Sequence, residues 1–228
     1  MKRFILASAA CVCLSACGGG GSPTQPSTPA PQPQPQPQPN RAPSVSATVA
    51  PAFGIQGLTT FTFVATASDA DSDALTYAWT VGDGGAADTA TFTRVFTQGG
   101  TFTPSVTVSD GRGGSASASA SSVIVGSATG AWRGTGPSAL GNFSLTLTQE
   151  NSGRVTGTYF DDTFGAGQLD AASTTNRIDA QGAIEMRVKQ GPFNDWTFRG
   201  QMDQTGRRIT GGVFGSGFNG QPFTLTKD

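Results

Sequence analysis

The sequence contains no histidine, and its three cysteines all lie within the first 17 residues. The chain therefore lacks the commonest general base and the commonest metal-binding side chain. No disulfide is available to the residues after position 17, so each module there has to be stabilised by its own hydrophobic core. With no nucleophile motif and no convincing acid pair either, the sequence argues against an enzyme.

The sequence also has no large excess of charge of either sign and no long amphipathic helical pattern. The net charge is −1, and 12 basic and 15 acidic residues follow residue 16, so no basic patch suggests a nucleic-acid partner. Glycine, serine and threonine are abundant, with 32 glycines among 228 residues. These features predict an all-β protein of one or two domains with many turns.

Residues 1–16 have the anatomy of a secretory signal. Lys2 and Arg3 precede an apolar segment, Phe4 to Ala16, which is shorter than the roughly 20 apolar residues that a membrane-spanning helix needs. Leu14, Ser15 and Ala16 then lead to Cys17, and this stretch resembles the signals of bacterial lipoproteins.

That resemblance implies a lipid anchor at Cys17. In such proteins the cysteine thiol carries a diacylglycerol group, the signal is removed before it, and the new amino terminus is acylated. Several acyl chains anchor a protein stably. Gly18, in place of the aspartate that retains lipoproteins in the inner membrane, implies the outer membrane, with the leaflet face left open. The alternative is a plain secretory signal with an incidental cysteine.

Residues 17–41 read as a linker rich in glycine, proline and glutamine. A strict Pro-Gln alternation runs from Pro31 to Pro39 and favours extended polyproline II. We interpret it as a stalk that holds the following modules away from the membrane. The alternative is a proline-rich ligand for an aromatic groove.

Residues 42–126 are expected to form a β-sandwich. Leu75, Tyr77, Trp79 and Val81 alternate with polar residues, and glycine-rich turns punctuate the segment. Phe102, Val106 and Val108 share one face of a later expected strand, in which Pro104 implies an edge or a bulge.

Several motifs of this segment resemble those of PKD domains, which have an immunoglobulin-like fold. They are Asp69 to Trp79, Gly82-Asp83-Gly84, and Gly100-Thr101-Phe102 through to Asp110. The resemblance implies that Trp79 is buried in the third strand and that the module acts as a spacer or a contact surface. Thr80 departs from the aspartate usual in the family, so any role of that carboxylate is not carried over.

Asp69, Asp71 and Asp73 form a tight carboxylate cluster and are a candidate Ca²⁺ site, since alternating acids offer hard oxygen ligands. The EF-hand pattern fails here, because Ala74 stands at the glycine position. The alternative is a solvated turn whose aspartates bond to backbone amides. No other cofactor is expected.

Residues 130–228 show alternating polar and apolar positions in about eight short segments joined by turns. Such a pattern closes most easily into an antiparallel up-and-down barrel, and glycines at 157, 200 and 211 permit tight coiling. It resembles small calycin-type barrels at the level of strand pattern.

Four aromatic side chains of this module are candidates for lining a ligand cavity: Trp132, Tyr159, Trp196 and Phe198. The alternative is a solid core, because aromatic residues dominate small cores. We therefore expect a non-enzymatic outer-membrane lipoprotein whose PKD spacer displays a barrel that binds a small molecule, a glycan or a protein. One alternative is a purely structural protein with a solid barrel. Another is a hydrolase that uses Asp161, Asp162 or Asp195.

Overall fold

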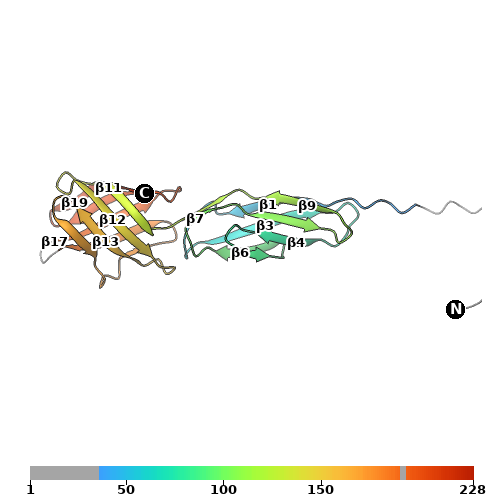
Figure 1. Ribbon diagram of the computed structural model, residues 1–228, viewed down its shortest axis with the longest axis horizontal. Helices are drawn as coiled ribbons and strands as arrows, with labels where there is room; N and C mark the ends of the chain where they lie inside the picture. The colour runs from blue at the N-terminus through green and yellow to red at the C-terminus, as the bar shows by residue number, and fades with distance from the viewer. Residues whose placement is uncertain (1–35, 191–193) are drawn as a thin grey trace, which may run out of the picture. The chain divides into compact units, whose positions relative to one another are not determined.

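The computed structural model describes residues 36–190 and 194–228, all of whose regular elements are β-strands (Figure 1). The predicted signal, Cys17 and most of the linker lie outside the described residues. The chain divides into Met1–Gln38 and a compact unit, Pro39–Asp228. In the described ranges no helix has the length and apolar character needed to cross a membrane. The all-β prediction is confirmed.

The first module is a sandwich of antiparallel sheets with a small third sheet beside them. One sheet has the order β1-β3-β6 and the facing one β5-β4-β8-β9, while β2-β10-β7 is a mixed sheet in which β10 pairs parallel with β2. The bounds are β1 Ser44–Ala50, β2 Phe53–Ile55, β3 Thr60–Ser68, β4 Thr76–Thr80, β5 Ala86–Ala87, β6 Thr91–Val95, β7 Gly100–Phe102, β8 Ser105–Ser109, β9 Ser115–Ser119 and β10 Val123–Gly126.

Because side chains alternate along these strands, every second side chain points into the space between the two sheets. Trp79 on β4 is 1% exposed and its indole N–H donates to the Thr89 carbonyl at 3.1 Å. Its ring lies 6.0 Å from that of Phe63 on β3, and Val106 and Val108 on β8 complete the same core. The predicted burial of Trp79 is confirmed.

The segment around Pro104 differs from the single strand expected there. β7 and β8 belong to different sheets, and Pro104 lies between them. Proline has no N–H for a sheet ladder, so the chain leaves one sheet before it and enters the next after it. Phe102 therefore pairs with Val123 on β10, while Val106 pairs with Trp79 on β4.

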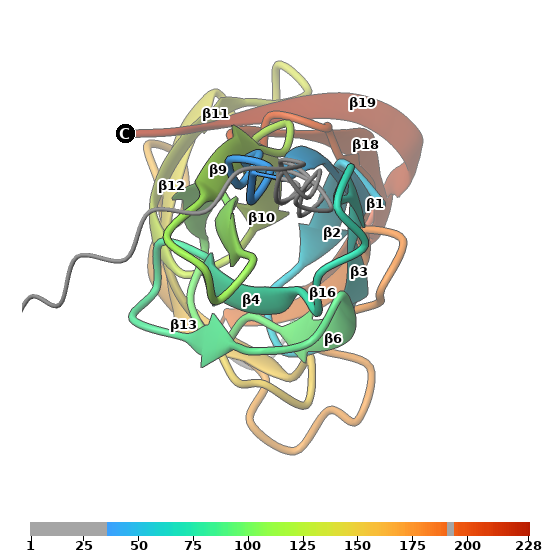
Figure 2. The same cartoon turned by 90° about the vertical axis from the view of Figure 1, so that its right-hand side faces the viewer.

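The second module is a closed antiparallel barrel. Its strands are β11 Gly130–Thr135, β12 Asn142–Gln149, β13 Val155–Asp161, β14 Gly165–Leu169, β15 Arg177–Ile178, β16 Ala183–Gln190, β17 Asn194–Met202, β18 Arg208–Gly215 and β19 Phe218–Lys227. Eight of them run in chain order around the ring, β14 pairs with β16 to close it, and β15 adds to β16. Figure 2 shows β19, β11, β12 and β13 following one another around the wall. The up-and-down barrel prediction is confirmed.

The period-2 pattern of the barrel strands sorts their side chains between interior and exterior. On β12, Phe143, Leu145 and Leu147 are buried, while Thr146 and Thr148 are exposed. The buried side chains of all the strands form one apolar cluster.

Three glycines allow the strands to approach closely inside this small barrel. A Cβ atom on Gly211 would collide with the carbonyl oxygen of Arg199 on the neighbouring strand. A Cβ on Gly157 would collide with the Thr146 carbonyl, and one on Gly200 would lie 2.8 Å from the Thr210 carbonyl. These close approaches agree with the expectation that the three glycines permit tight coiling.

We expect Gly211→Ala to destabilise the barrel by about 1–3 kcal/mol, because the added methyl group forces adjacent backbones apart. Denaturant unfolding of the full chain, followed by tryptophan fluorescence, measures the change. Thr210→Ala, an exposed neighbour on the same strand, is the control and should change stability by less than about 0.5 kcal/mol. Equal stability of Gly211→Ala and the parent chain would refute the close-approach argument.

Candidate functional site

The four aromatic residues proposed as a cavity lining lie in the filled interior of the barrel. Trp132 and Phe198 are 0% exposed, and Tyr159 and Trp196 are 1% exposed. The rings of Tyr159 and Trp196 are 5.9 Å apart, and Phe143 and Phe223 pack against Phe198. The four residues therefore belong to a packed core, which was the alternative to a ligand cavity. A ligand reaches them only by displacing packed side chains.

One part of the interior carries polar atoms without protein partners among the described residues. These are the Tyr159 hydroxyl, the indole N–H of Trp196 and Oδ2 of Asp161. Burial, followed by the neighbouring negative charge of Asp161, raises the pKa of Tyr159 above its ordinary value. Asp161 is 0% exposed, and its Oδ1 accepts the backbone N–H groups of Thr163 and Phe164 at 2.8 and 2.6 Å. It is a turn-forming residue.

The other two acids considered for hydrolysis have separate environments. Asp162 is exposed on the outer surface. Asp195 forms an ion pair with Arg187 at 2.6 Å, and this contact, together with the Coulombic effect of Asp195, raises the pKa of Arg187. Among the described residues neither joins a cluster of three acidic groups. Nothing in their contacts sets up one acid and one base.

A series of four grooves lies on the outer face of the barrel wall, with volumes of about 610, 410, 310 and 290 Å³. The two largest share Ser144 and Phe160. The second shares Thr158 and Gln168 with the 290 Å³ groove, which in turn shares lining residues with the 310 Å³ groove. The grooves therefore lie next to one another in a row, which we call the outer track.

Phe160 is the aromatic centre of the outer track. It is 51% exposed, although its neighbour Tyr159 is buried, because alternate positions of β13 face opposite ways. Ser144 on β12 and Ala166 on β14 pair with it on either side. The sequence analysis missed this residue; an aromatic at the outward position of an alternating strand was the available signal.

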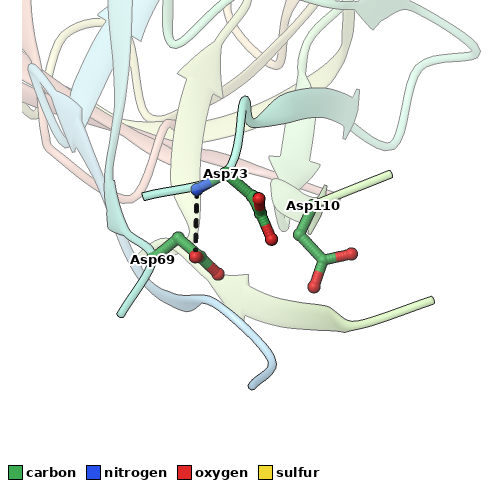
Figure 3. A group of neighbouring side chains, drawn as sticks. All are labelled: Asp69, Asp73 and Asp110. Carbon is green, nitrogen blue, oxygen red and sulfur yellow. Dashed lines mark hydrogen bonds between the residues drawn. The ribbon is translucent and has the colours of Figure 1, made fainter. Parts of the chain in front are cut away.

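Asp69 and Asp73 form an acidic cluster with Asp110, not with Asp71. Their carboxylates offer ligand atoms within 4.8 Å of one another, and Figure 3 shows Asp69 and Asp73 from the loop between β3 and β4 facing Asp110, which follows β8. Asp110 was not predicted from the sequence as a member of this cluster, although it begins the glycine-rich turn Gly111-Arg112-Gly113-Gly114. Its proximity to the other acids depends on β4 pairing with β8.

Asp71 has a different partner. Its carboxylate accepts two guanidinium hydrogen bonds and the backbone N–H of Arg41, at 2.9, 2.6 and 2.8 Å. The side-chain hydrogen bond and then the backbone bond from Arg41 hold the pKa of Asp71 below its ordinary value. The candidate Ca²⁺ set is thus divided: two of its members stay together and the third forms a surface ion pair.

Asp110 is 4% exposed and is held as a charged group. The side-chain amide of Asn40 donates to its Oδ2 at 2.7 Å, and the backbone N–H groups of Arg112 and Gly114 donate to Oδ1 at 2.8 and 2.9 Å. The Asn40 bond is the main reason why the pKa of Asp110 lies below its ordinary value, against the opposing effect of burial.

Comparison with known families agrees with the geometry of the first module. Its two facing sheets around Trp79 define an immunoglobulin-like β-sandwich. The family model of the PKD domain matches residues 40–125. These residues are a PKD domain, and the closed eight-stranded barrel follows them.

The remaining comparisons are sparse. No curated protein matched the sequence. Among solved structures, one from work on the promiscuous specificity of carbohydrate-binding modules of the β-sandwich superfamily is 16% identical, with coverage of 84% of this chain and 94% of that chain. Its TM-score is 0.37, and a superposition this loose supports no argument about the present chain.

We expect Asn40→Ala to raise the pKa of Asp110 toward the ordinary aspartate value of about 3.9. A depressed folded-state pKa stabilises the fold above the unfolded pKa, and that contribution is lost as the pH falls through the folded pKa. The variant should therefore be less stable than the parent chain at pH 7. Its stability should also fall by a smaller amount when the pH is lowered. Carboxyl NMR titration in chelator gives the pKa, with Ser46→Ala as the control. If the pKa of Asp110 is the same in Asn40→Ala and in the parent chain, the Asn40 hydrogen bond is not the main cause of the lowered pKa.

Proposed function

We propose that this chain is a lipid-anchored, non-enzymatic protein of the bacterial cell envelope whose barrel binds an extended glycan. The PKD domain acts as the spacer between the anchored segment and the barrel. The observation that supports glycan binding is the outer track with Phe160 at its centre. The core placement of the interior aromatics supports an external site over an internal one.

The form of the outer track suits a polymer better than a compact small molecule. Small-molecule sites are single concave pockets that enclose most of the ligand. Here four shallow grooves follow one another from Thr224 on β19 to Arg177 on β15 and share residues where they meet. An extended chain contacts each groove in turn, and each contact adds to the total affinity.

The lining chemistry suits sugar hydroxyl groups. Hydroxyl and amide side chains both donate and accept hydrogen bonds, which matches a ligand whose groups do the same. The outer track offers Thr135, Asn142, Ser144, Thr158 and Gln168. The exposed ring of Phe160 supplies an apolar face on which a pyranose ring can stack.

Charge in the largest groove is balanced, and the far end of the outer track has Arg154 and Arg177 with Asp170 in its lining. Arg133 in the largest groove is paired with Asp228 at 3.0 Å, and Asp162 lies in the same groove. Three arginines and two aspartates line the whole track, a small net charge that favours a neutral or weakly charged glycan over a strongly charged ligand.

The second candidate function is purely structural, with the barrel as a solid body in an envelope assembly. The packed apolar interior favours it, because side chains fill the space that an internal ligand would need. The two functions differ at Phe160: binding requires its exposed ring, whereas a solid structural body does not.

We expect Phe160→Ala to weaken glycan binding about tenfold or more, which corresponds to about 1.4 kcal/mol. Affinity electrophoresis of the full chain through a panel of neutral and cell-wall polysaccharides measures it. Phe164→Ala is a matched control, because this ring is 46% exposed but lies outside the grooves. If none of the polysaccharides slows migration of the parent chain, glycan binding is rejected and the structural function remains. Release of sugar products during incubation would reject the non-enzymatic assignment.

The anchor is tested at Cys17. Intact-mass analysis of protein extracted from membranes should show an amino-terminal Cys17 carrying a diacylglycerol and a further acyl chain. Cys17→Ala should remain unprocessed or be released into the soluble fraction, and Cys13→Ala should fractionate with the parent chain. A free thiol at residue 17, or an amino terminus after it, would rule out the anchor.

A further inference from the structure

We propose that Asp69, Asp73 and Asp110 of the PKD domain bind one Ca²⁺ ion, and that this ion fastens the first residues of the domain. The site differs from the one the sequence suggested, because Asp110 replaces Asp71. It is independent of the barrel and of glycan binding.

Two carboxylate oxygens of the cluster are buried and have no partner among the described residues. They are Oδ2 of Asp69 and Oδ2 of Asp73. The side chain of Asp73 is only 6% exposed, and it lies beside the other two acids (Figure 3). Burying a charged oxygen without a donor or a cation is unfavourable, so these atoms point to a positively charged ligand.

The remaining oxygens of the cluster are used to fix its shape. Oδ1 of Asp69 accepts the backbone N–H groups of Asp71 and Asp73 at 2.8 and 3.1 Å. Oδ1 of Asp110 is held by two backbone N–H groups in the same way. The free Oδ2 of Asp69 and the carboxylate of Asp110 are thus held in place before an ion arrives, which lowers the entropy cost of binding.

Protein cations balance the cluster only in part. The guanidinium of Arg112 lies 3.1 Å from Oδ1 of Asp73, but its side chain is 67% exposed. Arg41 is the other nearby cation, and its guanidinium is engaged by Asp71 and the Ala70 carbonyl. Three carboxylates within 4.8 Å therefore face one exposed arginine, and a divalent cation offers the charge that is missing.

Ca²⁺ fits this set better than other common divalent cations. Every ligand is a hard oxygen and no histidine or thiolate is present, which disfavours zinc. The acids come from two loops and have no octahedral arrangement imposed on them, and Ca²⁺ accepts six to eight oxygens in flexible geometry. Water and backbone carbonyls complete such shells.

Asn40 connects this site to the start of the domain. It donates to Oδ2 of Asp110 at 2.7 Å, and Arg41 beside it bonds to the loop that carries Asp69 and Asp73. Asn40 also has a side-chain carbonyl that can turn toward a cation. An ion held by Asp110 therefore secures the residues where the linker joins the PKD domain.

The test is calorimetric titration of the chelator-treated full chain with CaCl₂. We expect one ion per chain, with a dissociation constant between about 10⁻⁴ and 10⁻³ M, the range of extracellular modules. Asp73→Asn and Asp110→Asn should each weaken binding at least tenfold. Asp71→Asn, in the same loop but outside the cluster, is the matched control and should stay within about twofold. No binding at 10 mM CaCl₂, or equal losses in Asp71→Asn and Asp73→Asn, would overturn the site.

Arg112→Ala distinguishes a cation site from a cluster whose charge is already neutralised by protein cations. It also provides a test if an aspartate variant fails to fold. Removal of the competing guanidinium should raise Ca²⁺ affinity severalfold. Unchanged or weaker affinity would contradict the proposal.

Hydrogen exchange tests the fastening. Ca²⁺ should slow exchange of the backbone amides of Asn40 and Arg41 in the parent chain and in Asp71→Asn, but not in Asp110→Asn. If Ca²⁺ binds but does not slow exchange of these amides, the Ca²⁺ site stands and its role in fastening the first residues of the domain is refuted.

Discussion

The interior of an eight-stranded barrel holds either the side chains of its own wall or one small ligand, and in this chain the side chains fill it. Trp132, Trp196 and Phe198 occupy the space that an internal ligand would need. This packing stabilises a module that has no disulfide. The proposed glycan site therefore uses the polar outer positions of the same strands, and Phe160 is the prominent apolar side chain among them.

The PKD domain follows the same division between core and function. Its core around Trp79 takes one side chain in two from the facing sheets, so polar chemistry collects in the loops at the strand ends. Asp69, Asp73 and Asp110 meet there because β4 and β8 are neighbours. Pairing of these two strands within one sheet thus brings together acids from separate turns, and neither turn forms the cluster alone.

The sequence predicted much of the fold from local rules. Alternation predicted barrel strands with one buried face, as the burial of Phe143, Leu145 and Leu147 on β12 shows, and the PKD motifs located the buried Trp79. The prediction of one strand across Pro104 was wrong, because alternation continues across a proline that separates two sheets. The candidate sites were predicted less completely. Phe160 and Asp110 were both missed, since a site depends on which outward residues end up side by side.

The sequence by itself determined that this is an all-β chain with two disulfide-free modules after a signal-like segment and a proline-rich linker. Those properties depend on composition and on a two-residue period, which act between near neighbours along the chain. Only the tertiary structure decided that the barrel closes through β14 and β16, that its aromatics fill the interior, and that Asp110 takes the place of Asp71. These outcomes depend on pairings between distant strands, whose register is set by packing of the whole core.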